Sequence, residues 1–203
     1  MLVALVIKGT NIQSVDEYYL THIDDIRPDS ETVTISIRCD TILDNWDKLD
    51  DSLKSDKYVP ADGVILPTFR AVLRKGDTVY DIFSRVTRYS KIVTDCVYTV
   101  NYSSVYVKGI NHLYEFSCGE LSGWMYRVNG VFPGYGCSKY VLKDGDVIEW
   151  VYTCDLGRDV GGEFGTAPSV ENVCVQQKTD TYAFFYDKIA VVSPPKAAWR
   201  RCV

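Results

Sequence analysis

The side chains able to act as nucleophiles, general bases or metal ligands are few and scattered in this sequence. It has two histidines, His22 and His112, and seven cysteines without a CxxC spacing. A Cys-His nucleophile would require His112 to lie beside Cys118 or Cys137, and hydrolase motifs such as GxSxG and HExxH are absent. The missing CxxC pairs also count against a zinc ribbon or a thioredoxin-like redox motif. The sequence therefore predicts that the chain is not an enzyme.

Acidic residues and glycines make calcium binding and phosphate binding two further candidate functions. Asp144, Asp146 and Asp155 do not follow the DxDxDG spacing of a calcium loop, and Asp144-Gly145 is typical of a tight turn. The glycine-rich segment 161–165 lacks a following lysine and a strand-to-helix context, so it does not resemble a phosphate-binding loop. We expect no metal site and no bound cofactor.

Composition and charge exclude other classes of protein. With 203 residues, 46% of them hydrophobic, the chain is long enough for one domain with a sizeable core and short extensions. Its 27 acidic residues outnumber 22 basic ones, which argues against a nucleic-acid partner. No apolar run approaches the ~20 residues of a membrane span, and segment 1–7 is too short for a signal sequence.

The hydrophobic pattern predicts several strands and one helix. Residues 33–39 alternate with a period of two and are rich in β-branched side chains, as in a strand, and residues 71–74 predict a second strand. Thr78-x-x-Asp81 resembles a capping box, after which apolar residues follow helical spacing from Val79 to Tyr89. Further strands are expected at 97–100, 105–107, 114–116, 124–129 and 147–154. This order predicts an α+β fold of the β-grasp type, in which a mixed sheet wraps around one amphipathic helix.

The segment 122–157 is rich in turns and aromatic residues. Asn129-Gly130 accepts positive φ at both centres of a type I′ turn, so the alternating runs on either side predict a hairpin. Alternation places Trp124 and Tyr126 on one face of their strand; that face is either displayed or part of the core, and the pattern leaves both open. The loop 132–136, with two glycines and a proline, is the best candidate for a contact tip. The candidate ligand-binding residues are Trp124, Tyr126, Phe132, Tyr135 and Tyr140.

The same segment resembles a known family. The stretches WMYRVNG at 124–130, GCSKY at 136–140 and DGDVIEW at 144–150 are similar to the transcobalamin-like C-terminal domain family, as are upstream stretches at 36–43, 62–67 and 113–119. In bacteria this family is mostly a domain of unknown function on secreted or surface proteins. The resemblance covers residues 31–163 and implies a β-grasp module there, with extensions at 1–30 and 164–203. In the cobalamin carriers of the family, the similar domain closes over cobalamin held against a helical domain.

The cysteine positions suggest disulfides. Cys118 precedes the strand at 124–129 and Cys137 follows the partner expected for it, so a Cys118–Cys137 bridge would close the aromatic hairpin and contribute about 3 kcal/mol. Cys39 and Cys154 end strands that are parallel neighbours in a β-grasp, so we expect a second bridge there. The alternative is that some of them are buried free thiols. The state of Cys96, Cys174 and Cys202 stays open.

These observations predict a non-catalytic, extracellular or cell-surface binding module whose aromatic hairpin holds a protein, a glycan or a small molecule. Two alternatives remain. One is a cobalamin-binding β-domain, which only the family resemblance implies. The other is a structural spacer in a larger surface or mobile-element-encoded protein.

Overall fold

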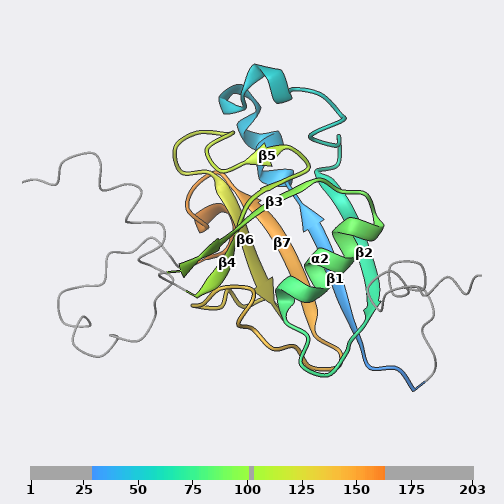
Figure 1. Cartoon of the computed structure of the whole chain (residues 1–203). Coiled ribbons are helices and arrows are strands. Elements are labelled where there is room, and N and C mark those ends of the chain that lie inside the picture. The colour runs from blue at the N-terminus through green and yellow to red at the C-terminus, as the bar shows by residue number, and fades with distance from the viewer. Residues whose placement is uncertain (1–28, 101–102, 163–203) are drawn as a thin grey trace, which may run out of the picture.

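The computed structural model describes residues 29–100 and 103–162. In these residues two open sheets and few helices form an α+β fold, as predicted (Figure 1). The strands are β1 (Thr32–Arg38), β2 (Val64–Val72), β3 (Thr94–Thr99), β4 (Ser104–Ile110), β5 (Leu113–Tyr114), β6 (Gly123–Val128) and β7 (Val147–Thr153). The helices are α2 (Val79–Tyr89) and the short 3-10 helices η1 (Asp40–Lys48), η2 (Asp51–Leu53) and η4 (Arg158–Val160).

The larger sheet has the strand order β2-β1-β7-β6. Its central pair, β1 and β7, is parallel, and each outer strand is antiparallel to its neighbour. The period-two pattern of β1 places Val33, Ile35 and Ile37 in the core, where each is at most 1% exposed. The centre of the mixed sheet thus joins β1 and β7, the first and last strands of the described residues.

Helix α2 covers one face of this sheet (Figure 1). The predicted capping box is present: the Thr78 hydroxyl accepts from the Asp81 amide, and the Asp81 carboxylate accepts from the Thr78 amide at 2.8 Å. The predicted apolar stripe is buried from Val79 to Val86, whereas Tyr89 at its end is exposed. The Phe83 ring packs on the Trp150 ring with 4.6 Å between centroids. The helix and its start are therefore confirmed.

The smaller sheet has the order β3-β4-β5 and is antiparallel throughout. The Trp124 indole N–H links the sheets, because it donates from β6 to the Leu113 carbonyl of β5 at 2.8 Å. Strands β3 and β4 are longer than the predicted 97–100 and 105–107, and β5 is shorter than 114–116. The second sheet itself was not predicted, since alternation within each strand does not say which strands pair.

The turn at Asn129-Gly130 has the predicted geometry, but the predicted hairpin partner is wrong. Asn129 has φ 53° and Gly130 φ 79°, both positive as a type I′ turn requires. Beyond the turn only Val128 and Val131 form a bridge, and β6 pairs instead with β7 along its whole length. Pro133 has no amide to donate to a ladder, so the chain leaves the sheet soon after the turn.

The predicted extensions 1–30 and 164–203 lie outside the described residues except at positions 29 and 30, and so do Cys174 and Cys202. Within the described part of the chain, no helix has the length and apolar character to cross a membrane.

Candidate functional site

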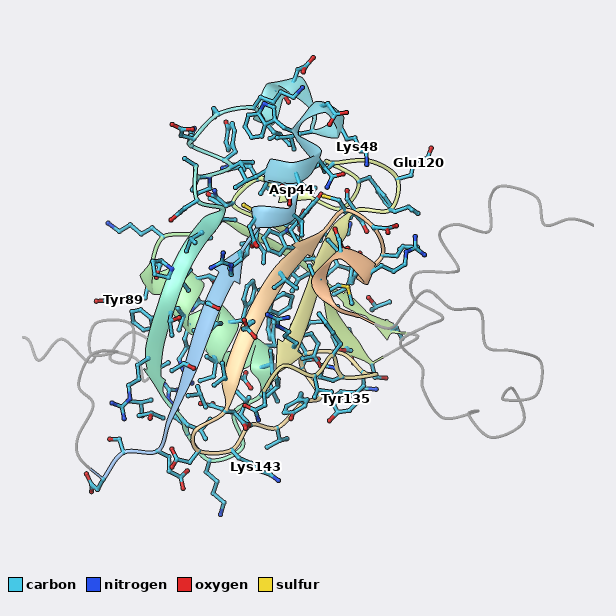
Figure 2. All side chains as sticks on the ribbon, turned by 180° about the vertical axis from the view of Figure 1, so that it is seen from behind. Asp44, Lys48, Tyr89, Glu120, Tyr135 and Lys143 are labelled. Atoms are coloured by element: carbon cyan, nitrogen blue, oxygen red, sulfur yellow. The ribbon has the colours of Figure 1, made fainter. Side chains whose placement is uncertain are left out.

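The segment 132–140, called the aromatic loop below, displays a pair of stacked rings. The Tyr135 and Tyr140 rings lie 5.7 Å apart between centroids, 15° from parallel. Tyr135 is 46% exposed, and Tyr140 is half-buried. The Tyr126 hydroxyl of β6 donates to the Tyr135 carbonyl at 2.6 Å and so fixes the backbone beneath the exposed ring. Figure 2 shows Tyr135 at the end of the molecule opposite η1.

Helix α2 holds the aromatic loop from one side. The amide of Val79 donates to the Tyr140 carbonyl at 3.0 Å, and the amide of Tyr80 donates to the Cys137 carbonyl at 3.1 Å. Both amides belong to the first turn of α2, where backbone donors have no partner within a helix. Carbonyl groups of the loop therefore satisfy amides at the start of α2, and these hydrogen bonds fix the loop to the helix.

Strand β4 holds the aromatic loop from the other side. The Ser138 hydroxyl accepts from the Val105 amide at 3.0 Å and shares a second hydrogen bond with the Ser104 hydroxyl at 3.0 Å. The Cys137 thiol donates to the Val105 carbonyl at 3.5 Å. With contacts on both sides, little conformational freedom is left for the loop to lose when a ligand binds.

The loop leaves no room for a side chain at Gly136 beside β4. A Cβ atom there would lie 1.7 Å from the Ser104 hydroxyl oxygen and 2.5 Å from its Cβ. We expect Gly136→Ala to lower the free energy of unfolding by about 1–3 kcal/mol, because the loop must move away from β4. Urea unfolding followed by tryptophan fluorescence measures this change.

A second substitution tests the cause of that loss. Without the Ser104 side chain the nearest atom to the new Cβ is the Ser104 Cα at 3.9 Å, an ordinary contact. Ser104→Gly should therefore cost less in the Gly136→Ala background than in the wild type. Equal costs in the two backgrounds would show that the contact with Ser104 does not determine the loop position.

The other predicted ligand-binding residues lie deeper. Trp124 is 5% exposed and packs edge-on against Tyr152, with 5.1 Å between ring centroids. The face of β6 that carries Trp124 and Tyr126 is thus the core face, which decides between the two registers left open by the sequence. Tyr126 is half-buried beside Trp150, at 5.5 Å between centroids. Of these two residues, Tyr126 supports the aromatic loop through its hydrogen bond to the Tyr135 carbonyl.

Phe132 has a cationic neighbour that sequence reasoning missed. The Arg127 guanidinium lies 5.9 Å from the centroid of the half-buried Phe132 ring. A bidentate hydrogen-bonded pair with Glu149, at 2.7 and 2.9 Å, orients the guanidinium and raises the pKa of Arg127. In the sequence, the only sign of this contact is that Arg127 lies five residues before Phe132. The Asn129-Gly130 turn between them brings the two side chains together.

Tyr126 and Tyr140 are neutral hydrogen-bonding groups at neutral pH. Burial raises the pKa of Tyr126, and the neighbouring Cys137 adds to the effect. Burial also raises the pKa of Tyr140, with a further contribution from Asp146. Beside the exposed Lys139, the loop therefore offers a stacked aromatic surface with phenol groups, a combination suited to apolar ligands that carry hydroxyl or amide groups.

The acidic residues that a calcium site would use have structural partners. Asp144 accepts from the Thr32 amide at 2.7 Å, Asp146 accepts from the Asn129 side-chain amide at 2.9 Å, and Asp155 pairs with Arg158. Within residues 29–100 and 103–162, no group of three or more His, Cys, Asp or Glu side chains is arranged to hold a metal ion.

The predicted disulfides are not formed. Cys39, Cys96, Cys118, Cys137 and Cys154 are free thiols. The β1–β7 register pairs Arg38 with Val151, so its continuation sets Cys39 opposite Tyr152, two residues short of Cys154. Because β6 pairs with β7, Cys118 and Cys137 lie before and after the same strand rather than on neighbouring strands.

Two of these thiols are poor nucleophiles. Burial raises the pKa of Cys39 and of Cys137 to about 12, so both are protonated at neutral pH. His112, which a cysteine hydrolase would need beside Cys118 or Cys137, packs edge-on against Tyr58 at 5.3 Å between ring centroids. The prediction that the chain is not an enzyme stays a prediction.

Comparison with known proteins gives one family and several solved structures, which include a haptocorrin and a bacterial protein. Residues 76–154, less than half of the chain, match the family described as Domain of unknown function (DUF4430). A haptocorrin structure in complex with Cbi has a TM-score of 0.42 at 12% identity and covers 64% of this chain, which spans only 27% of the haptocorrin chain. A putative metal binding protein from Ruminococcus gnavus ATCC 29149 has a TM-score of 0.38 at 10% identity, over 61% of this chain and 96% of that chain. No curated protein matches the sequence.

Proposed function

We propose that the chain is a non-catalytic binding module that holds its ligand through the aromatic loop. The observation that carries this proposal is the stacked pair of Tyr135 and Tyr140, with Tyr135 46% exposed on a segment fixed at both sides. Exposed tyrosines on a fixed backbone provide contact area at small cost in conformational entropy. The ligand is a protein, a glycan or a small molecule with a flat or apolar face.

The proposed module comprises residues 31–163 and belongs to the β-grasp class. Support comes from the mixed sheet with its parallel central pair β1–β7 and from α2, which packs on it through Phe83. The sequence motifs of the transcobalamin-like family support an extracellular or cell-surface location. The cysteines of the described residues are free thiols, so they give no support to an extracellular location.

The experiment compares ligand capture by three forms of the full chain. One form is the wild type, the second carries Phe132→Ala and Tyr135→Ala, and the third carries Tyr98→Ala. Tyr98 of β3 is the matched control, because it is 61% exposed and lies on the smaller sheet. Each form is screened against the same glycan, cofactor and surface-protein collections.

We expect the double variant to lose at least 10-fold in affinity for ligands that the wild type captures, as for residues at the centre of a contact surface. The Tyr98→Ala form should bind as the wild type does. Loss of the two rings should change the free energy of unfolding by about 1 kcal/mol or less per aromatic contact, so weaker binding would not reflect unfolding. Unchanged capture by the double variant would exclude the aromatic loop as the site.

Cobalamin binding is the alternative implied by the family motifs. Several matching residues have structural roles here: Asn129 bonds to Asp146 and to the Val147 amide, and Gly145 occupies a turn with φ 82°. A shift in the cyanocobalamin spectrum on adding the protein would favour this alternative, and an unchanged spectrum would remove it. The spacer alternative predicts that the aromatic loop packs against a neighbouring domain of a longer protein.

A further inference from the structure

Two buried thiols lie side by side beneath η1. The Cys118 thiol donates to the Asn45 carbonyl at 3.4 Å, and the Cys154 thiol donates to the Thr41 hydroxyl at 3.8 Å. Thr41 and Asn45 are four residues apart in η1 and are joined by a hydrogen bond from the Asn45 side chain to the Thr41 carbonyl at 2.9 Å. Both sulfur atoms therefore contact neighbouring residues of one short helix.

The strand register brings the two cysteines together from the other side. Gly123 of β6 pairs with Thr153 of β7, so the next residues outward are Ser122 and Cys154. The Ser122 hydroxyl accepts from the Cys118 amide at 3.0 Å and shares a hydrogen bond with the Tyr152 hydroxyl at 3.0 Å. Cys118 therefore lies at the end of the β6–β7 ladder, and Cys154 is the first residue after β7 at the same end.

The proximity of the two thiols also affects their ionisation. The interaction with Cys154 lowers the pKa of Cys118, with a smaller contribution from Lys48, while the interaction with Cys118 raises the pKa of Cys154. Cys118 therefore forms a thiolate more readily than an isolated cysteine, and Cys154 lies beside it as a second thiol.

We propose that Cys118 and Cys154 are a redox-active pair that forms a disulfide by exchange with a small-molecule disulfide such as oxidised glutathione. The Cys118 thiolate attacks one sulfur of the oxidant, which gives a mixed disulfide and releases one glutathione thiolate. Cys154 loses its proton and attacks the Cys118 sulfur, which forms the protein disulfide and releases the second glutathione thiolate. Two protein thiols are oxidised and one glutathione disulfide is reduced to two thiols.

The bond would link the segment between β5 and β6 to the end of β7 and would close the segment 119–153. It lies at the end of the molecule marked by Asp44, Lys48 and Glu120, whereas Tyr135 lies at the opposite end (Figure 2). Both cysteines are at most 7% exposed, so the exchange takes place while the chain folds or when η1 opens. The proposal is independent of the ligand-binding role of the aromatic loop.

Peptide mapping of the full chain tests the pairing directly. The reduced protein is refolded with oxidised and reduced glutathione, remaining thiols are alkylated, and the product is digested with trypsin. Cleavage at Arg127, Lys139 and Lys143 separates Cys118, Cys137 and Cys154 into different peptides. We expect one linked pair that joins the Cys118 and Cys154 peptides, with Cys39 and Cys137 alkylated.

Thermal unfolding gives a second measurement. Closing a loop of this size should raise the Tm of the oxidised wild type by roughly 10 °C over the reduced protein. Cys118→Ala and Cys154→Ala should each abolish that difference, and Cys39→Ala should keep it. A fully alkylated protein that has folded in the glutathione buffer, or a bond that joins Cys118 to Cys137 or Cys39 to Cys154, would overturn the proposal.

Discussion

Replacing Phe83 by alanine is expected to lower the free energy of unfolding by about 3–5 kcal/mol. Phe83 is fully buried between α2 and the larger sheet, and its ring lies 4.6 Å from that of Trp150. The substitution removes an aromatic side chain from the contact that joins helix and sheet, and the neighbouring rings cannot close the cavity. Urea unfolding monitored by circular dichroism measures the loss.

The control for Phe83→Ala is Tyr89→Ala on the same helix. Tyr89 is 36% exposed and contacts Phe69 at 5.8 Å between ring centroids, so its removal should cost about 1 kcal/mol. Because both variants remove an aromatic side chain from α2, the difference between them isolates burial against the sheet. Similar losses in the two variants would contradict the packing of α2 described here.

Replacing Asp77 by alanine is expected to cost about 3–5 kcal/mol. The Asp77 carboxylate accepts two hydrogen bonds from Arg85, at 2.6 and 3.1 Å, and a third from the Arg74 amide at 2.8 Å. The side chains of Asp77 and Arg85 are only 10% and 15% exposed. Without Asp77 a guanidinium charge stays in a poorly solvated position, which is the main source of the cost.

A double-mutant cycle separates that charge from the rest of the interaction. Arg85→Met keeps an unbranched apolar side chain and removes the charge, so Asp77→Ala should cost less in the Arg85→Met background than in the wild type. Thermal and urea unfolding of the four proteins give the coupling free energy. If the two single losses simply add, the ion pair does not stabilise the turn before α2.

Features of the fold that depend on neighbouring residues could be predicted from the sequence. The Thr78 and Asp81 side chains satisfy each other at the start of α2, and Asn129-Gly130 adopts positive φ at both residues. In each case the signal and the structure lie within a few residues, so the residue types alone determine the geometry.

Features that depend on distant residues could not be predicted in the same way. The alternation in β6 does not indicate whether its partner is the segment after Gly130 or β7, and the structure selects β7. That single difference moved Cys137 away from the position expected for it beside Cys118. The period-two pattern also could not say which face of β6 is buried, and Trp124 is in the core because that face meets Leu113 and Tyr152.

The candidate site was predicted in part. Tyr135 was named from the sequence because a loop with glycines and proline displays its side chains, and Tyr140 because it belongs to the same aromatic segment; the two rings stack. Their support by the amides of Val79 and Tyr80 depends on a contact between segments about 60 residues apart, for which alternation and spacing carry no signal. The role of the loop in binding stays a prediction.

Tyrosine-ring NMR of the full chain tests the central claim most directly. The protein is labelled with ¹³C in its tyrosine rings, and a ligand captured in the screen is added in steps. If the aromatic loop holds the ligand, the ring signals of Tyr135 and Tyr140 shift with increasing ligand, while those of Tyr98 and Tyr114 on the smaller sheet do not, although both are exposed. Shifts confined to Tyr98 and Tyr114, with Tyr135 and Tyr140 unchanged, would contradict it.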